Sequence, residues 1–411
     1  MQKFLDWLER VLTPLAKVIG ENKYLVAIRD GFLLSTPLLI VGSVFLLIAN
    51  FPLPQWDTWM SHLLGKDWAT MMSVPASASF DVMTILAVVG IAYSLGKQFN
   101  VDAMQAGIIA LVSFFIVTPY QTLFTPENSS KVYEVTSLPL KWMGSSGLFL
   151  GMIVALIATR LFVAIVRKGW TIKMPEGVPP TVVKSFEALI PSFLVVTLMF
   201  LVNWLAALTP YGNLQDVIFE FLQTPLLSLG NTLGAMSIAY LFLHFFWFFG
   251  INGGSVVGAV FNPVLRALSV ENLQAFKDGH EIPNIITGQF QDMFATFGGA
   301  GSTLSLIIVM VLFCKSQRIK KLSQLSLIPG VFGINEPIIF GLPIVLNPIL
   351  LIPFVLVPAI NIIIAYFAMD WGLVPLTNGI QLPWTTPPII SGFLVSGWQG
   401  SILQALLDRK S

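Results

Sequence analysis

Glu336 is the residue whose type and position most directly indicate chemistry. It lies in the apolar run 333–343, and the only other acid between Lys321 and Asp408 is Asp370. A carboxylate inside a membrane segment is costly unless it has a partner or a proton, so such residues are usually functional. A carboxylate in that position can orient or deprotonate a hydroxyl group of a bound ligand. The alternative for Glu336 is a structural carboxyl group that caps neighbouring backbone N–H groups.

A second set of polar residues lies in other apolar stretches. His244 is the only ionisable residue in its stretch, and Asn252 follows eight residues later, about two helical turns along. Trp384 lies between prolines and offers an aromatic face and one N–H donor. Sugar rings have apolar faces and hydroxyl rims, so a cavity with Trp, Asn and Glu suits a sugar. The alternative for His244 is a hydrogen-bonded packing residue.

The elements that must position these residues are apolar helices interrupted by glycine and proline. The interrupted stretches include 144–147, 249–254, 297–303, 328–343 and 382–388. Hydrocarbon cannot satisfy the freed backbone groups, so such stretches are buried in protein or line a polar cavity, where transporters bind their cargo. Gly147 belongs to this predicted binding surface because glycine lets a ligand approach the backbone. Helix packing through small residues is the alternative.

The composition predicts that these elements lie in a membrane. Of 411 residues, 55% are hydrophobic and 10% are charged, and the mean hydropathy is +0.80. A soluble domain has roughly 25% charged residues. The chain is therefore a polytopic membrane protein, not a cytosolic enzyme or a disordered chain, and its net charge of +1 argues against a nucleic-acid partner. A single cysteine and three histidines predict neither a disulfide nor a metal site, and no cofactor is expected.

The predicted fold is all-α, with about ten transmembrane helices, re-entrant hairpins and an amphipathic helix over the first 20 residues, on the membrane surface or as a cap on the bundle. The candidate spans are stretches of apolar residues: 31–48, 82–95, 104–118, 148–166, 193–208, 233–249, 304–314, 344–367 and 389–407.

The distribution of lysine and arginine predicts the orientation. Basic residues cluster before the first span, around the loop 169–184, at 315–321 and at 409–410, whereas none occurs in 185–265. The positive-inside rule then places both termini and the loop 169–184 in the cytoplasm. This proline-containing loop divides the chain into an amino-terminal membrane half, 1–184, and a carboxyl-terminal membrane half, 185–411.

Four segments together resemble one family. They are Phe248-Phe249-Gly250-Ile251-Asn252-Gly253-Gly254, Gly333-Ile334-Asn335-Glu336-Pro337-Ile338-Ile339-Phe340-Gly341, Met174-Pro175-Glu176-Gly177-Val178-Pro179-Pro180 and Pro383-Trp384-Thr385-Thr386-Pro387. The chain resembles, over nearly its whole length, the IIC membrane component of the bacterial phosphotransferase system, in the lactose/cellobiose (diacetylchitobiose) family.

The resemblance implies a homodimer in the bacterial cell membrane, with the amino-terminal half at the dimer interface. It implies that the carboxyl-terminal half, 185–411, holds the sugar between re-entrant segments. It also implies group translocation, in which a disaccharide is bound from outside, carried inward and phosphorylated at its C6 hydroxyl by a phosphocysteine on a partner IIB protein. In that picture Glu336 is the catalytic residue, and the substrate-binding residues are Asn252, Glu336, Asn335, Trp384, His244 and Gly147.

One position departs from the family pattern. The family commonly has histidine where this chain has Asn252, and asparagine cannot accept a proton at physiological pH. A histidine relay would then require His244 to face the same cavity. The sequence shows no IIB domain before Ser411, so the phosphocysteine is expected on another polypeptide, unless this chain is one portion of a longer protein.

Two other classes remain as alternatives from the residues alone. The first is an ion-coupled secondary transporter for a polar solute, although few acids or bases are available in the spans after Lys184. The second is a membrane enzyme with Glu336 as general base, which would lack a metal cluster or a nucleophile pair. The sequence does not distinguish lactose, cellobiose, diacetylchitobiose and aryl β-glucosides.

Overall fold

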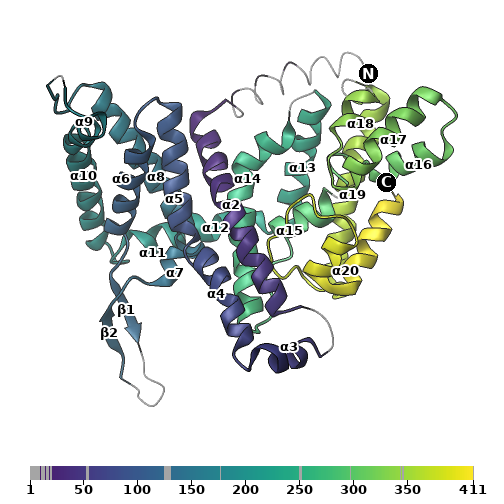
Figure 1. The fold of residues 1–411 in the computed structure, drawn as a ribbon, viewed down its shortest axis with the longest axis horizontal. Coiled ribbons are helices and arrows are strands. Elements are labelled where there is room, and N and C mark those ends of the chain that lie inside the picture. The colour runs from purple at the N-terminus through teal and green to yellow at the C-terminus, as the bar shows by residue number, and fades with distance from the viewer. Residues whose placement is uncertain are drawn as a thin grey trace. The chain divides into compact units, whose positions relative to one another are not determined.

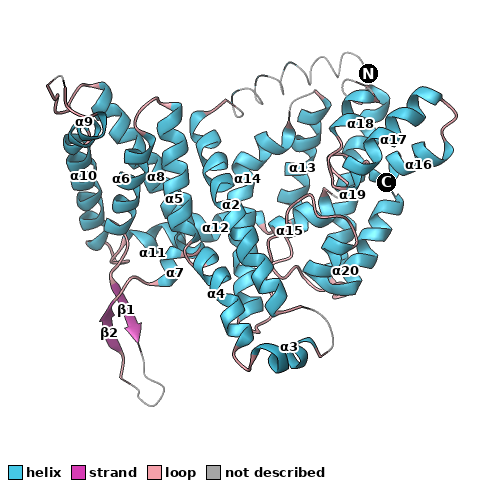
Figure 2. Cartoon of the chain, in the orientation of Figure 1, coloured by secondary structure: helices cyan, strands magenta, loops and turns pink. Residues whose placement is uncertain are grey.

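The computed structural model describes residues 10, 14, 18, 21–51, 55–124, 131–175, 177–249, 252–296, 298–342, 344 and 347–410 (Figure 1). The predicted amphipathic helix at 1–20 lies almost entirely outside the described residues. The described chain is mainly helical, with one small two-stranded sheet (Figure 2). Two compact units share it. Unit 1 comprises Met1–Glu21, Ile40–Pro75 and Leu227–Ser411, and unit 2 comprises Asn22–Leu39 and Ala76–Leu226.

Unit 2 is a helical bundle with a short hairpin. The first part of α2 (Lys23–Ala49) packs closely on α5, where a Cβ atom added to Gly90 would lie 2.6 Å from the Gly31 carbonyl oxygen. The chain of unit 2 then forms α5 (Met83–Gln98), α6 (Ala103–Ile116), β1 (Gln121–Phe124), β2 (Tyr133–Thr136), α7 (Leu140–Met143), η1 (Ser145–Gly147), α8 (Leu148–Arg167), α9 (Pro180–Glu187), α10 (Leu189–Ala207), α11 (Leu214–Ile218) and the π-helix η2 (Phe219–Gln223).

Strands β1 and β2 form an element that the sequence analysis did not predict. They pair antiparallel, with Gln121 opposite Thr136 and Phe124 opposite Tyr133. Threonine, tyrosine and valine favour the extended backbone, which accounts for strands in this otherwise helical chain.

Unit 1 combines helices with long non-helical connections. Its large apolar core joins α13 (Leu233–Phe248), α14, α16, α19 and α20, with buried Phe290, Phe294 and Ile362 among its members. Besides α3 (Trp56–Leu64), the remaining elements of the chain are α4 (Trp68–Phe80), α12 (Thr224–Gly230), α14 (Gly253–Lys277), α15 (Gly288–Phe290), the π-helix η3 (Gln291–Ala295), α16 (Leu304–Phe313), α17 (Gln317–Val331), α18 (Glu336–Gly341), α19 (Pro348–Asp370) and α20 (Ile390–Lys410).

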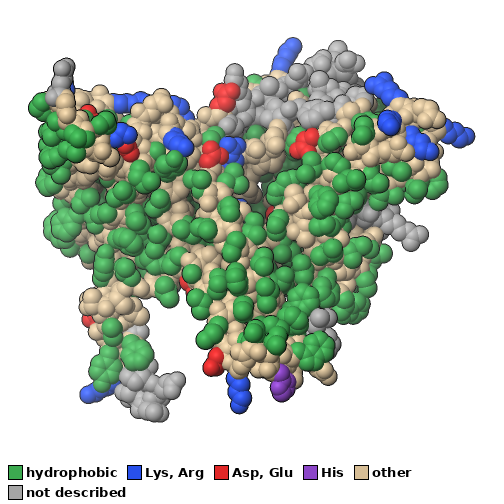
Figure 3. Space-filling view, in the orientation of Figure 1, with side chains coloured by type: hydrophobic (Ala, Val, Ile, Leu, Met, Phe, Trp, Pro, Cys, Tyr) green, Lys and Arg blue, Asp and Glu red, His purple; other side chains and the backbone are tan. Residues whose placement is uncertain are grey.

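The prediction of an all-α polytopic membrane protein is confirmed. Among the described residues, six helices are long and apolar enough to cross a membrane, and the pair Leu214–Gly230 and Leu233–Phe248, bent by 75°, makes up to seven. On the face shown in Figure 3, hydrophobic side chains cover the helices and charged ones lie mostly near their ends. The predicted number of about ten included shorter apolar segments such as α16.

Helix α14 is a span that the sequence analysis missed. Asn262, Pro263, Arg266 and Glu271 interrupt its apolar pattern, yet it continues for 25 residues. The predicted span 389–407 corresponds to α20, which is kinked at Ser396 and Gly397.

The two compact units also divide the chain differently from the predicted halves 1–184 and 185–411. Residues 185–226 belong with the amino-terminal helices, and 40–75 belong with the carboxyl-terminal ones. The assignment of the dimer interface to the first half remains a prediction.

Candidate functional site

Asn335 joins two of the glycine-rich stretches of unit 1. Its side chain is buried, and its Nδ2 donates to the Ala300 carbonyl oxygen at 2.6 Å and to Thr303 Oγ1 at 2.8 Å. A Cβ atom added to Gly299, which has φ +86°, would lie 2.5 Å from Asn335 Cγ. Glycine at 299 therefore permits the close approach, and the hydrogen bonds of Asn335 fix the loop 298–303 against the turn 333–335.

Glu336 is the first residue of α18 and is exposed. The helix is held from its other face, since Ile338 and Ile339 are fully buried and their backbone N–H groups both donate to the Asn335 carbonyl oxygen at 3.0 Å. Buried residues on either side of Glu336 thus hold its backbone while its carboxylate stays accessible. The geometry suits a group that receives a hydrogen bond from a ligand.

Trp384 belongs to a third irregular stretch that meets the same turn. Its side chain is 57% exposed, and a Cβ atom added to Gly333 would lie 3.6 Å from its ring atom Cε3. Residues 383–386 form a turn, in which the Thr386 N–H donates to the Pro383 carbonyl oxygen at 2.8 Å. The structure therefore brings Trp384, Asn335 and Glu336 to one turn, with an indole face and a carboxylate both accessible.

Asn252 lies where α13 gives way to α14. Its side chain is exposed and caps α14, with Oδ1 accepting from the Ser255 N–H at 2.9 Å. A Cβ atom added to Gly253 would collide with the Leu243 carbonyl oxygen, so the two helices meet closely here. The residues Gly250 and Ile251 of the predicted motif lie outside the described residues.

His244 is fully buried within α13. Its Nδ1 lies 2.8 Å from the Tyr240 carbonyl oxygen, and its ring meets the Phe354 ring edge-on with centroids 5.4 Å apart. A carbonyl oxygen only accepts, so Nδ1 carries the proton and Nε2 is an acceptor, for which the described residues supply no donor. A Cβ atom added to Gly301 would collide with the Phe354 ring. The Phe354 ring therefore contacts both His244 and the loop 298–303.

Gly147 belongs to unit 2, unlike the other predicted site residues. It is buried at the end of η1, where a Cβ atom would collide with the Trp142 carbonyl oxygen. Backbone packing is therefore sufficient to require glycine at this position.

The sequence analysis missed a group of buried carboxamides that hold the irregular stretches. Asn272 Nδ2 donates to the carbonyl oxygens of Asn284 at 2.8 Å and Thr377 at 2.9 Å, while its Oδ1 accepts from the Asn284 N–H at 3.0 Å. Gln404 accepts from the N–H groups of Ile389 at 2.7 Å and Gly392 at 3.0 Å. The sequence signal that could have found this group is the occurrence of Asn and Gln within apolar stretches.

Two further features limit the chemistry of unit 1. Among the described residues no group of three or more His, Cys, Asp or Glu side chains is placed to hold a metal ion. Charged residues also occur inside α14, where Glu271 Oε2 accepts from Asn284 Nδ2 at 2.9 Å. This carboxylate supports the Asn284 loop, whereas Glu336 is exposed.

The fold and the site define a multi-pass membrane carrier with a polar site made from broken helices. The family model described as "Phosphotransferase system, EIIC" matches residues 29–358, and the chain belongs to this family. It is the membrane permease component of a sugar phosphotransferase system, as its sequence resemblance indicated.

Individual relatives agree with this assignment. The chain is 41% identical to the cellobiose-specific EIIC component of Geobacillus stearothermophilus, with 98% of this chain and 91% of that protein covered. It is also 41% identical to the lichenan permease IIC component of Bacillus subtilis (strain 168), with 99% and 90% covered. The crystal structure of the transporter ChbC, the IIC component of an N,N'-diacetylchitobiose-specific phosphotransferase system, has 43% identity and a TM-score of 0.96, with 98% and 94% covered.

Proposed function

We propose that this permease imports a β-linked disaccharide of the cellobiose, lactose or diacetylchitobiose type and presents it to a phosphorylated IIB protein. The observation that carries the proposal is the convergence of Trp384 and Glu336 on the turn 333–336. An accessible indole ring near Gly333 and an accessible carboxylate three residues along the same turn match the apolar face and hydroxyl rim of a sugar. The names of the relatives, which include cellobiose, lichenan and diacetylchitobiose permeases, support the same class of substrate.

The proposed chemistry assigns one role to each residue of this turn. Trp384 stacks on a sugar ring, and Glu336 accepts a hydrogen bond from the C6 hydroxyl group. The hydroxyl oxygen attacks phosphorus on the IIB phosphocysteine, the P–S bond breaks and the thiolate leaves. Glu336 takes the hydroxyl proton as the new O–P bond forms. Asn335 positions Glu336 through its buried hydrogen bonds rather than by contact with the sugar.

Asn252 and His244 have different proposed roles in the same unit. Asn252 is exposed and retains amide hydrogens for a sugar hydroxyl while its oxygen caps α14. His244 supports the loop 298–303 through Phe354 and is not a proton relay. If His244→Ala abolishes phosphotransfer in protein with normal thermal stability, this division of roles is wrong.

We also propose that both termini lie in the cytoplasm and that the permease is a homodimer formed through its amino-terminal half. The lysine and arginine distribution supports the orientation, and the family resemblance supports the dimer. A cysteine at Lys173 should resist a membrane-impermeant reagent applied to intact cells. Light scattering of the purified permease should give the mass of two chains, and a monomer would contradict the dimer.

Uptake by membrane vesicles tests the proposed function. Wild-type vesicles with IIB and the general phosphotransfer proteins should accumulate sugar phosphate only when phosphoenolpyruvate is supplied. Glu336→Gln keeps the shape and hydrogen bonding of the side chain but removes its basicity, so phosphorylation should fall by roughly 10²–10⁴-fold while sugar binding is partly retained. Asp370→Asn is the matched control, because Asp370 is exposed at the end of α19.

Two outcomes would contradict the proposal. Uptake of unmodified sugar driven by an ion gradient, without phosphoenolpyruvate, would favour the secondary transporter. Wild-type phosphorylation by Glu336→Gln would remove the assigned proton acceptor.

A further inference from the structure

Four helix ends of unit 2 meet around the turn that joins α5 to α6. Helix α2 begins at Lys23, whose Nζ donates to the Gln98 carbonyl oxygen at 3.2 Å. Helix α8 ends at Arg167, whose Nη2 donates to the Phe99 carbonyl oxygen at 3.0 Å. These contacts place the start of α2, the ends of α5 and α8 and the start of α6 at one end of the unit (Figure 1).

The Phe99 ring at this turn carries three cations. Lys23 Nζ lies 4.7 Å from its centroid, and the Cζ atoms of Arg160 and Arg167 each lie 5.2 Å away. Each contact is a cation–π interaction, which is worth about 0.5–1 kcal/mol at an exposed site. The ring gathers three like charges that would otherwise repel one another.

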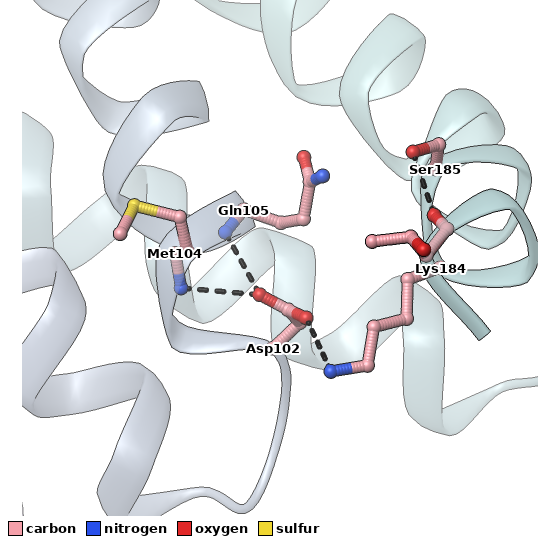
Figure 4. Close-up of polar contacts among 6 residues, drawn as sticks. Asp102, Met104, Gln105, Lys184 and Ser185 are labelled. Carbon is pink, nitrogen blue, oxygen red and sulfur yellow. Dashed lines mark hydrogen bonds and ion pairs between the residues drawn. The ribbon is translucent and has the colours of Figure 1, made fainter.

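The charge of this group is not balanced within the described residues. None of their carboxylates lies within 4.0 Å of Lys23, Arg160 or Arg167. The acid at the adjoining turn, Asp102, pairs instead with Lys184 at 3.2 Å and accepts from the N–H groups of Met104 and Gln105 (Figure 4).

Three cations at one turn without a carboxylate partner among the described residues indicate an acceptor of negative charge from outside them.

The position of the group along the membrane identifies the source of the anion. Helix α8 has 20 residues, which span about 30 Å and match the hydrocarbon core, so its ends lie at the headgroup level. Trp170 follows it, is exposed, and has Lys168 Nζ 5.2 Å from its ring. Tryptophan is enriched at the membrane interface.

We propose that Lys23, Arg160 and Arg167, gathered on the Phe99 ring, bind the phosphate group of an anionic phospholipid. The phosphate oxygens accept from the two guanidinium groups and the ammonium group. The lipid would connect the start of α2 to the end of α8 and stabilise this end of unit 2. A soluble phosphate offers the same chemistry but not the acyl chains, which contact the apolar sides of the helices.

Native mass spectrometry of the delipidated, detergent-solubilised permease tests the site. Wild type should retain phosphatidylglycerol in preference to phosphatidylcholine. Arg160→Gln removes one charge from the side chain that lies over the Phe99 ring. The preference for phosphatidylglycerol over phosphatidylcholine should then fall by about fivefold. Arg160→Lys keeps the charge and should retain most of the preference.

Lys141→Gln is the matched control. Lys141 also forms a cation–π contact, 4.3 Å from the Trp142 ring, but it precedes α8 and so lies toward the other end of that helix. Its substitution should leave lipid preference unchanged.

Three results would overturn the proposal. The first is an unchanged preference for phosphatidylglycerol in the single variant Arg160→Gln and in the double variant that combines Lys23→Gln with Arg160→Gln. The second is thermal protection of wild type by millimolar inorganic phosphate equal to that by phosphatidylglycerol, which would indicate a soluble anion. The third is loss of binding to the partner IIB protein in these variants with lipid preference intact, which would indicate a protein-docking surface.

Discussion

The two compact units differ in how their backbone is packed and hydrogen-bonded. Unit 2 packs its helices through small residues, as where Gly90 meets Gly31 and where a Cβ atom added to Gly151 would lie 2.7 Å from Thr84 Cγ2. Unit 1 has irregular backbone inside its core and binds it with side-chain amides such as Asn272 and Gln404.

The difference follows from the backbone. A complete helix satisfies its own N–H and C=O groups, so neighbouring helices in hydrocarbon need only shape complementarity. A broken helix leaves such groups unpaired, and a carboxamide supplies both a donor and an acceptor on one short side chain. The unit with the accessible carboxylate and indole is thus also the one that needs polar support.

The largest expected effect is the loss of one of these amides. Asn272→Leu leaves the N–H and C=O of Asn284 and the C=O of Thr377 without their partner, so the free energy of unfolding should fall by roughly 3–6 kcal/mol. Fluorescence-detected thermal unfolding in detergent measures the change.

Gln274→Leu provides the control for this experiment. Gln274 is exposed on the same helix, and its amide donates to Asp278 Oδ2 at 2.8 Å. The control should change stability by less than about 0.5 kcal/mol. Equal effects of the two substitutions would contradict the supporting role given to the buried amides of unit 1, because burial of the bonded backbone would then not matter.

The corresponding substitution in unit 2 adds a methyl group between helices. In Gly90→Ala the new Cβ atom would lie 2.6 Å from the Gly31 carbonyl oxygen, so α2 and α5 must separate and stability should fall by about 1–3 kcal/mol. Gly234→Ala is the matched control, since nothing lies within 4 Å of its added Cβ atom and alanine favours a helix. Thermal unfolding should show a loss for the first variant only.

Trp384 separates function from stability within unit 1. Its side chain is 57% exposed, so Trp384→Ala should leave thermal unfolding nearly unchanged while weakening disaccharide binding by about 1–3 kcal/mol. Isothermal calorimetry with cellobiose and diacetylchitobiose measures the loss. Trp371→Ala, at an aromatic side chain that is 70% exposed at the end of α19, should bind normally. Unchanged affinity in Trp384→Ala would make Trp384 a membrane anchor.

The sequence predicted the parts of this comparison that depend on local composition. Glycine and proline in 328–343 located the broken backbone, and the lone acid located Glu336. Trp384 was assigned from its place in a proline-broken stretch and from the resemblance to the family. Its proximity to Gly333 could not be predicted, because it depends on the folding of distant segments. Its role in sugar binding remains a prediction until binding is measured.

Other features could not be predicted because tertiary contacts outweigh local pattern. Asn262, Pro263 and Arg266 made 253–277 look unlike a span, although this stretch forms one helix. Asn272 serves its neighbours in a loop 12 residues later and in another 105 residues away, and no sequence period records such contacts. Asn335 was predicted to bind substrate, which stays a prediction, and its buried hydrogen bonds to Ala300 and Thr303 across more than 30 residues could not be predicted from the sequence.

The smallest expected effect concerns a charge at the surface of unit 2. Asp102 caps α6, and the N–H of Gln105, together with the Lys184 ammonium, lowers the pKa of its carboxyl group below the ordinary value of 3.8, although burial opposes them. Asp102→Asn keeps a capping oxygen and removes the charge, so the free energy of unfolding should fall by less than about 1 kcal/mol near pH 7.

The pH dependence of this difference identifies its origin. A lowered pKa in the folded state means that the ionised carboxylate adds stability above the ordinary pKa, and that this stability is lost as the pH falls through the folded value. The advantage of wild type over Asp102→Asn should therefore persist from pH 7 to about 5 and be lost only as the pH falls below the ordinary value of 3.8. Lys184→Gln should give a similar small loss, and combining the two substitutions should add little, because both remove one ion pair. A difference that grows toward acid pH would show that the charge of Asp102 destabilises the fold, so that its ion pair with Lys184 would not stabilise unit 2.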